Sequence, residues 1–124
     1  YNKDNYTNYL NFNHAELNSD LVDYYKGLIE FRNTYKSFRR AKTEQIKFID
    51  DLQNEFSIAF SVSAIDDEFL VLMNADQNVS ETINLHEGSW QILVNEDKAG
   101  IEVLSTISGS VDIPAVSGMI LQRE

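Results

Sequence analysis

The hydrophobic pattern of this chain changes period once, near residue 44, and this change limits the fold more than any other feature. In residues 19–36, apolar side chains recur at the three- and four-residue spacing of a helix. From residue 44 onward, apolar and polar side chains alternate at the two-residue spacing of strands, as in "FSIAFSVS" (56–63). We therefore expect one helix followed by a β-rich module, and no alternation of strands with helices.

The segment expected to form the helix, residues 19–36, has a broad apolar face. Asp20 and Asp23 lie near its start, where they complement the positive end of the helix dipole. Gly27 in mid-helix costs about 1 kcal/mol relative to Ala, which indicates that another backbone approaches closely there. The apolar positions at helical spacing are Leu21, Val22, Tyr24, Tyr25, Leu28, Ile29, Phe31 and Tyr35. This face is wider than a helix needs to lie on one sheet, so we expect it to pack against a further partner.

Eight short segments after residue 44 have the composition of strands, and turn residues separate them at intervals of roughly 8–12 residues. The segments are 45–49, 56–63, 68–73, 81–85, 89–94, 101–105, 110–114 and 118–122. This spacing predicts a mainly β fold: an antiparallel Greek-key β-sandwich of about eight strands, preceded by one α-helix.

Two of these segments give more detail about burial. Residues 68–73 form an uninterrupted apolar run, which indicates a strand that is covered on both faces. The alternation in 56–63 divides the strand into an apolar and a small-polar face. Phe56, Ile58, Phe60 and Val62 share one face, and Ser57, Ala59, Ser61 and Ser63 share the other.

Composition excludes several classes of function. The chain has no cysteine, which excludes disulfides, thiolate zinc sites and cysteine nucleophiles. Residues 1–43 have a net charge of +2 and residues 44–124 a net charge of −12, so the acidic body argues against a nucleic-acid partner. No run approaches the roughly 20 apolar residues of a membrane span, so we expect no membrane partner. The basic segment 36–42 is typical of a helix C-terminus.

No residue pattern in the chain predicts a catalytic or metal site. His14 and His86 are isolated from one another and from further ligands, so we interpret them as exposed histidines. The acidic pairs in 49–51 and 66–68 are typical of turns, where Asp caps the backbone, and this interpretation is preferred to calcium binding. We therefore expect no catalytic residue, no metal and no cofactor in this chain.

Aromatic residues are the remaining candidates, because flat rings stack on sugars. Trp90 alternates with Gln91 in a strand-like segment, which favours a core position over a sugar-binding platform. The leader "YNKDNYTNYLNFN" (1–13) interleaves Asn with Tyr and Phe. This composition suits either contact with sugar hydroxyls or an irregular loop held by its own aromatic residues.

Two stretches resemble a known family. The segment "DYYKGLIEFR" (23–32) and the segment "INLHEGSWQILVNEDKAGIEVLSTISGSVDIPAVSGMIL" (83–121) resemble the C-terminal end of type I pullulanases. These are α-glucan debranching enzymes of the α-amylase superfamily, glycoside hydrolase family 13. The most specific positions are Trp90, Ala99-Gly100, Ser108-Gly109 and Pro114, whereas His86, Phe12 and Ala115 depart from the family pattern.

The resemblance implies a division of the chain. Residues 1–43 correspond to the end of the catalytic (β/α)₈ barrel, as a loop plus the last helix, and residues 44–124 correspond to the C-terminal β-sandwich domain. The family's catalytic carboxylates lie upstream of Tyr1, so no acidic residue of this chain inherits their roles. Tyr1 and Asn2 match a loop near the glucan, and the resemblance assigns them to a substrate subsite.

The resemblance also implies the function and partners of the chain. The parent enzyme cleaves α-1,6 linkages in α-glucans, and this chain has a structural, stabilising role without catalysis of its own. Its partners are the barrel of the same parent chain and, through the parent, α-glucan. In the isolated chain, the barrel-facing side of the helix is expected either to fold back on the sandwich or to pair with a second copy. A starch-binding module is the alternative, and an immunoglobulin-like adhesion module is a third interpretation. The compartment stays open, with an extracytoplasmic location slightly favoured.

Overall fold

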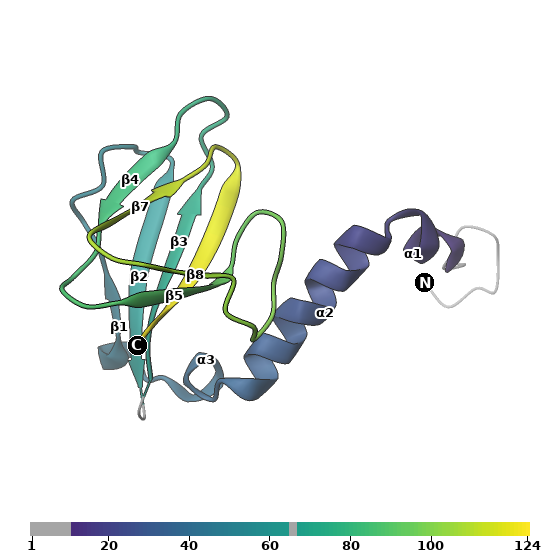
Figure 1. The fold of residues 1–124 in the computed structure, drawn as a ribbon, viewed down its shortest axis with the longest axis horizontal. Helices are drawn as coiled ribbons and strands as arrows, with labels where there is room; N and C mark the ends of the chain where they lie inside the picture. The colour runs from purple at the N-terminus through teal and green to yellow at the C-terminus, as the bar shows by residue number, and fades with distance from the viewer. Residues whose placement is uncertain (1–10, 65–66) are drawn as a thin grey trace.

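The fold is built on a six-stranded antiparallel sheet, seen in a computed structural model that describes residues 11–64 and 67–124. The strand order is β1-β2-β3-β8-β5-β6, and β4 pairs with β7 in a second, two-stranded sheet that packs against the first (Figure 1). The strands are β1 Ile46–Phe48, β2 Ser57–Ala64, β3 Asp67–Asn74, β4 Glu81–Asn84, β5 Trp90–Val94, β6 Ser105–Ile107, β7 Ser110–Ile113 and β8 Ser117–Arg123. The expected mainly β fold, an antiparallel sandwich with a preceding helix, is confirmed.

The core of the sandwich lies between the two sheets. Its largest side chain is Trp90, which is 0% exposed and whose indole Nε1 donates to the carbonyl oxygen of His86 at 3.3 Å. The other buried members of this cluster come from both sheets: Ala59, Leu70, Leu72, Ile83, Leu85, Ile92, Val111, Ile113, Met119 and Leu121. Burial of this apolar surface is the main term that stabilises the sandwich.

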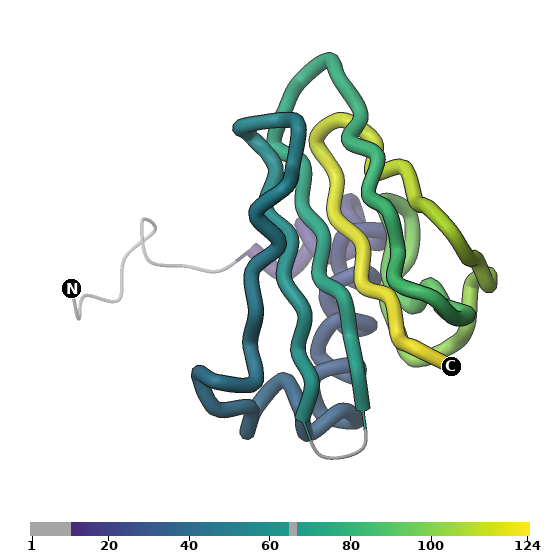
Figure 2. The backbone as a smooth tube through the Cα atoms, turned by 90° about the vertical axis from the view of Figure 1, so that its left-hand side faces the viewer, coloured from purple at the N-terminus to yellow at the C-terminus, as the bar shows by residue number. Residues whose placement is uncertain are grey.

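The opposite face of the large sheet is partly covered by helix α2, Ser19–Thr34. Phe31 of α2 packs against Val62, Phe69, Leu93 and Val94, which form a second apolar cluster. Figure 2 shows α2 behind the sheet in that view. Leu70 and Leu72 of β3 face the first cluster and Phe69 the second, so the prediction that 68–73 is covered on both faces is confirmed.

The predicted helix over 19–36 ends slightly earlier than expected, at Thr34, and the basic segment after it forms a short helix, α3, Ser37–Arg40. A shorter helix, α1, Asn13–Leu17, precedes α2, and a 3₁₀ turn, Thr43–Gln45, precedes β1. Ser37 is buried, and its Oγ donates to the carbonyl oxygen of Ala64 at 3.0 Å. None of the helices in the described part of the chain is both long and apolar enough to cross a membrane.

One strand prediction is wrong in position. Residues 101–105 were expected to form a strand, but the strand in this region is β6, Ser105–Ile107. Ile101 and Val103 are exposed, whereas Leu104 packs against the inter-sheet core and its backbone N–H donates to the carbonyl oxygen of Ile92. Strand pairing in this region therefore begins at Ser105, and residues 101–104 belong to the connection from β5 to β6.

Candidate functional site

Helix α2 is fastened to the sandwich by a turn that follows β5. The Tyr24 hydroxyl donates to the carbonyl oxygen of Asn95 at 2.8 Å. Gly27 is buried against the backbone of Ala99, and a Cβ on Gly27 would overlap the Ala99 carbonyl oxygen. The Asn95 side chain holds the turn by accepting the backbone N–H of Lys98 at 2.8 Å. The expectation that a backbone approaches Gly27 is thus confirmed, and the two stretches that resemble pullulanases meet at this contact.

The C-terminal part of α2 is held by aromatic rings. The ring of Phe31 lies 4.8 Å from that of Tyr35, 4.8 Å from that of Phe38 and 5.7 Å from that of Phe69, measured between centroids. Most of these pairs are edge-to-face, the arrangement that aromatic quadrupoles favour. Burial raises the pKa of Tyr35, and the nearby charge of Asp67 adds to that rise.

The other side of α2 has an exposed row of apolar side chains. Leu21, Tyr25 and Ile29 follow one another at four-residue spacing, and each is more than half exposed. We call these three residues the α2 stripe. The polar side of α2 is neither of these two sides. It includes Lys26 and Asp23, which form an ion pair with Nζ and Oδ1 2.8 Å apart. The broad apolar face seen in the sequence therefore has two parts. One part packs on the sandwich, and the other, the α2 stripe, is exposed.

A second exposed apolar area lies on the large sheet. Its members are 46% to 66% exposed, and we call them the sheet patch: Phe48, Phe56, Ile58 and Met73. Ile58 pairs with Met73, and the ring of Phe48 lies 5.6 Å from that of half-buried Phe60. The alternation in 56–63 indicated that Phe56 and Ile58 share a face, but it did not reveal that this face is exposed there while Ala59, on the other face, is 1% exposed.

Those residues singled out in the sequence that the structure describes do not assemble into a site. Tyr1 and Asn2, the expected substrate-binding residues, lie outside the described residues. His14 is exposed in α1, and His86 is exposed in the turn before β5. Trp90 is a core residue, as its alternation predicted, so it offers no sugar-binding platform. Within 11–64 and 67–124, no three His, Asp or Glu side chains are grouped so as to hold a metal ion.

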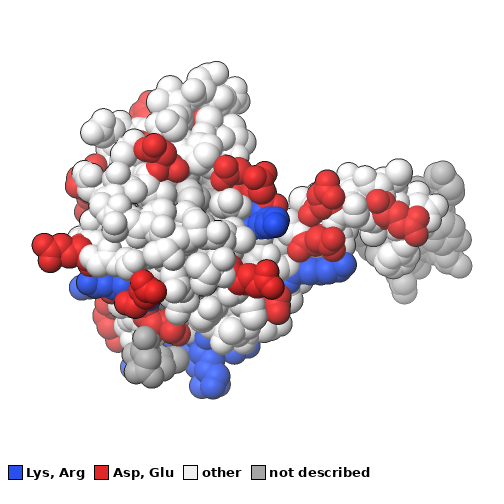
Figure 3. Space-filling model, in the orientation of Figure 1, with Lys and Arg blue, Asp and Glu red and all other residues white. Residues whose placement is uncertain are grey.

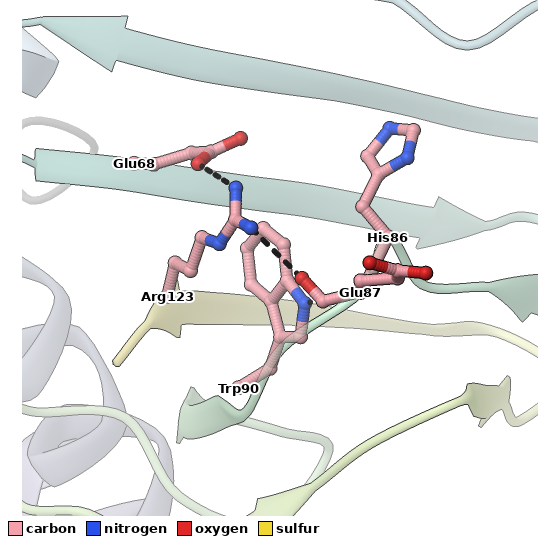
Figure 4. A network of polar contacts seen from close by, with 5 residues as sticks. All are labelled: Glu68, His86, Glu87, Trp90 and Arg123. Carbon is pink, nitrogen blue, oxygen red and sulfur yellow. Dashed lines mark hydrogen bonds and ion pairs between the residues drawn. The ribbon is translucent and has the colours of Figure 1, made fainter.

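A polar network closes the end of the sandwich above Trp90 (Figure 4). The Arg123 guanidinium lies 6.0 Å from the Trp90 ring centroid. Its Nη1 contacts Glu68 Oε2 at 2.9 Å, and its Nη2 donates to the carbonyl oxygen of Glu87 at 2.8 Å. This network joins β8 to β3 and to the turn before β5. Its contacts are explained by a structural role.

Two open hollows lie beside these elements, and neither has the arrangement of a catalytic centre. The first, of about 520 Å³, lies between α2 and the segment after β5 and is lined by Asp20, Asp23, Glu30, Asp97 and Glu102 among others. Figure 3 shows acidic side chains spread over the sandwich and along α2 on the face in view. Burial raises the pKa of Tyr24 at its edge, and the charge of Glu96 adds to the rise.

The second hollow lies beside Glu81, which is buried. Its carboxylate accepts the backbone N–H groups of Gln53 at 3.0 Å and Asn54 at 2.9 Å. Nearby, Asp76 accepts the backbone N–H groups of Asn78 and Val79, and these bonds hold the pKa of the Asp76 carboxyl below its ordinary value. These carboxylates are engaged in holding loops, which leaves the α2 stripe and the sheet patch as the candidate functional surface.

No protein-family model matches the chain. Among solved structures, the pullulanase from Bacillus acidopullulyticus matches 91% of the chain with a TM-score of 0.81 and 27% sequence identity. GBS pullulanase SAP in complex with maltotetraose matches 91% with a TM-score of 0.73 and 21% identity. Trehalulose synthase MutB from Pseudomonas mesoacidophila MX-45 matches 93% with a TM-score of 0.68 and 15% identity.

The last two matches are distant in sequence and show the fold alone. This chain spans only 15%, 17% and 20% of the three longer chains, so it corresponds to one segment of each. The pullulanase matches confirm the resemblance seen in the sequence, and they are consistent with a chain that corresponds to the C-terminal fragment of a pullulanase.

Proposed function

We propose that this chain is the C-terminal, structural part of a pullulanase-like glycoside hydrolase that cleaves α-1,6 linkages in α-glucans. Residues 1–43 then form the last loop and helix of the catalytic barrel, and residues 44–124 form the β-sandwich domain that follows. The supporting observation is that α2 has two apolar sides. One side packs on the sandwich through Phe31, and the other is the exposed α2 stripe. Exposed apolar rows are unfavourable in water, so the stripe requires a further partner.

In this proposal the sandwich holds α2 in place, and the barrel covers the α2 stripe. The contacts at Tyr24 and Gly27 fix the middle of the helix, and the rings around Phe31 fix its C-terminal part. The catalytic carboxylates belong to the preceding barrel and not to this chain. Because the GBS pullulanase was solved in complex with maltotetraose, we propose a related α-glucan as the ligand of the parent enzyme. Tyr1 and Asn2 remain a proposed subsite for it.

Hydrolysis of pullulan tests this assignment. The purified chain should release no reducing sugar from pullulan, whereas the longer polypeptide that contains it should do so. The same polypeptide truncated after residue 43 should unfold at a lower temperature, because α2 loses the surface on which Phe31 is buried. Pullulan hydrolysis by the 124-residue chain itself would overturn the proposal.

Starch binding by the sandwich is the competing function. Trp90, the candidate stacking residue that the sequence already favoured as a core residue, is fully buried and offers no platform for starch. Migration of the purified chain in a native gel with and without starch separates the two functions. We expect equal migration; retardation by starch would favour the binding module.

A further inference from the structure

We propose that one end of the molecule, the basic end, attaches the chain to the surface of an anionic lipid bilayer. The basic end consists of six exposed side chains: Arg32, Lys36, Arg39, Arg40, Lys42 and Lys47. Its partner is a membrane surface rich in acidic phospholipid headgroups. This inference does not depend on the proposed function. The expectation of no membrane partner concerned spanning segments, and attachment to a bilayer surface requires none.

Charge is strongly segregated along the chain. Residues 32–47 contain six of the ten Lys and Arg residues and one of the twenty Asp and Glu residues, so their net charge is +5. The remaining residues have a net charge of −15. Figure 3 shows Lys and Arg side chains at the lower end of the molecule, where Figure 1 places α3. The molecule therefore has one positive end on an otherwise acidic body.

The fold holds α3 so that its cations face outward. Ser37 is buried, with its Oγ 3.0 Å from the carbonyl oxygen of Ala64, and the ring of Phe38 lies 5.0 Å from that of Phe69. Arg32 Nη1 donates to the carbonyl oxygen of Phe38 at 2.9 Å, which joins the end of α2 to α3. These contacts fix one side of α3 on the sandwich and leave the Lys and Arg side chains beside it exposed.

Helix dipoles explain only part of this positive charge. A cation near a helix C-terminus is stabilising, but the effect is confined to the last turn. Arg32 lies in the last turn of α2, and Arg39 and Arg40 lie in the last turn of α3. Lys42 and Lys47 lie outside both helices. The two ion pairs found among the described residues involve none of the six side chains, so the charge of the basic end has no explanation in those pairs.

A bilayer suits this charge distribution because it meets the molecule from one side. Each Lys or Arg close to an anionic membrane raises the binding constant by about five-fold. The Debye length is about 8 Å at physiological ionic strength, so acidic residues further from the headgroups than this are largely screened. A flexible polyanion that extends past the basic end meets the acidic body instead, and a second copy adds another net charge of −10.

Cosedimentation of the 124-residue chain with vesicles tests the inference. The anionic vesicles contain equal amounts of phosphatidylglycerol and phosphatidylcholine, and pure phosphatidylcholine vesicles are the neutral comparison. Lys36→Gln/Lys42→Gln removes two cations from the basic end. The matched control, Lys26→Gln/Lys98→Gln, removes two exposed Lys residues from elsewhere and gives the same net charge. Circular dichroism verifies that both variants keep the wild-type fold.

We expect wild type to bind the anionic vesicles at least about 100-fold more tightly than the neutral ones at about 0.1 M salt. Lys36→Gln/Lys42→Gln should weaken this binding by about 25-fold, whereas the control should change it by less than about two-fold. Equal losses in the two variants would show that net charge controls binding and would overturn the inference. Equal binding of wild type to both kinds of vesicle would also overturn it.

The dependence of wild-type binding on ionic strength is an independent test. At about 0.01 M salt the Debye length is about 30 Å, so the bilayer repels the acidic body, and at about 1 M it is about 3 Å, so the basic end is screened as well. Binding should therefore be strongest near about 0.1 M salt. A steady decrease from the lowest salt concentration upward would overturn the inference. Tighter binding to a single-stranded oligonucleotide than to the anionic vesicles would identify a polyanion as the partner and overturn it too.

Discussion

Gly27 in α2 and Ala99 in the turn after β5 are in direct backbone contact, and no side chain fits between them. A Gly inside a helix is disfavoured by about 1 kcal/mol relative to Ala. The contact with Ala99 explains why Gly is present at this position. The contact joins the helix to the sandwich at the place where the two pullulanase-like stretches meet. It packs α2 on the sandwich, and the pullulanase resemblance implies that this helix is the last one of a preceding barrel.

Gly27→Ala should therefore destabilise the chain despite the better helix propensity of Ala. The added methyl group overlaps a backbone carbonyl, which cannot move aside as a flexible side chain can, so we expect a loss of about 1–3 kcal/mol in the free energy of unfolding. Urea denaturation measures it. Asn33→Ala, at an exposed position of the same helix, is the control and should be neutral or slightly stabilising. A Gly27→Ala variant that gains stability would show that α2 and the turn are not in contact.

Tyr24→Phe should weaken the same attachment by about 1 kcal/mol, the usual net value of a hydrogen bond. The substitution removes the hydroxyl that donates to the Asn95 carbonyl oxygen and leaves that acceptor without this donor. Tyr25→Phe removes a hydroxyl from an exposed ring on the α2 stripe and should change the unfolding free energy little. Equal effects of the two substitutions in thermal or urea denaturation would contradict this assignment.

The helix and most strands could be predicted because their periods are local properties of the sequence. The apolar spacing in 19–36 predicted α2, Ser19–Thr34, and the run in 68–73 predicted a strand covered on both sides. The Gly in α2 also indicated a close backbone, but its partner, Ala99, is distant in the sequence, so no local pattern could identify it. The two stretches that resemble pullulanases contain both residues, but the resemblance did not pair them.

The exposed surface could not be predicted, because periodicity groups residues by face without revealing what covers that face. Ala59, in the small-polar face of 56–63, packs in the core, whereas Ile58 in the apolar face is exposed. The apolar segment 101–105 was predicted as a strand, yet the chain there leaves the turn that contacts α2 and only then forms β6. In both segments, tertiary contacts determine burial and strand position more strongly than intrinsic strand propensity does. The subsite assigned to Tyr1 and Asn2 stays a prediction, since both lie outside the described residues.

Asp76 should make the stability of the chain sensitive to acid. Hydrogen bonds from the backbone N–H groups of Asn78 and Val79, and from the Asn54 side chain, lower the pKa of its carboxyl below the ordinary 3.8. A carboxyl whose pKa is lower in the folded state stabilises that state above its unfolded pKa. This stabilisation is lost as the pH falls from about 3.8 through the lower folded value.

Asp76→Asn should therefore lower stability at neutral pH and reduce the further loss below pH 3.8. Urea denaturation at a series of pH values measures both effects. Asp51→Asn, in the exposed loop before β2, removes the same charge and serves as the control. Parallel pH profiles for wild type and Asp76→Asn would refute a role for this carboxylate.

Val116→Asn should stabilise the chain, because Val116 has a φ of 51° in the turn before β8. A β-branched side chain is strained in this left-handed region, at a cost of about 1–3 kcal/mol, whereas Asn tolerates it. Val116 is 70% exposed and its backbone N–H donates to the Asp76 carbonyl oxygen, so the substitution removes little packing and keeps the turn. We expect a gain of about 1 kcal/mol in the free energy of unfolding. Val79→Asn makes the same chemical change at an exposed residue whose φ is not positive, and it should give no gain. If both variants behave alike, the turn at Val116 is not under strain.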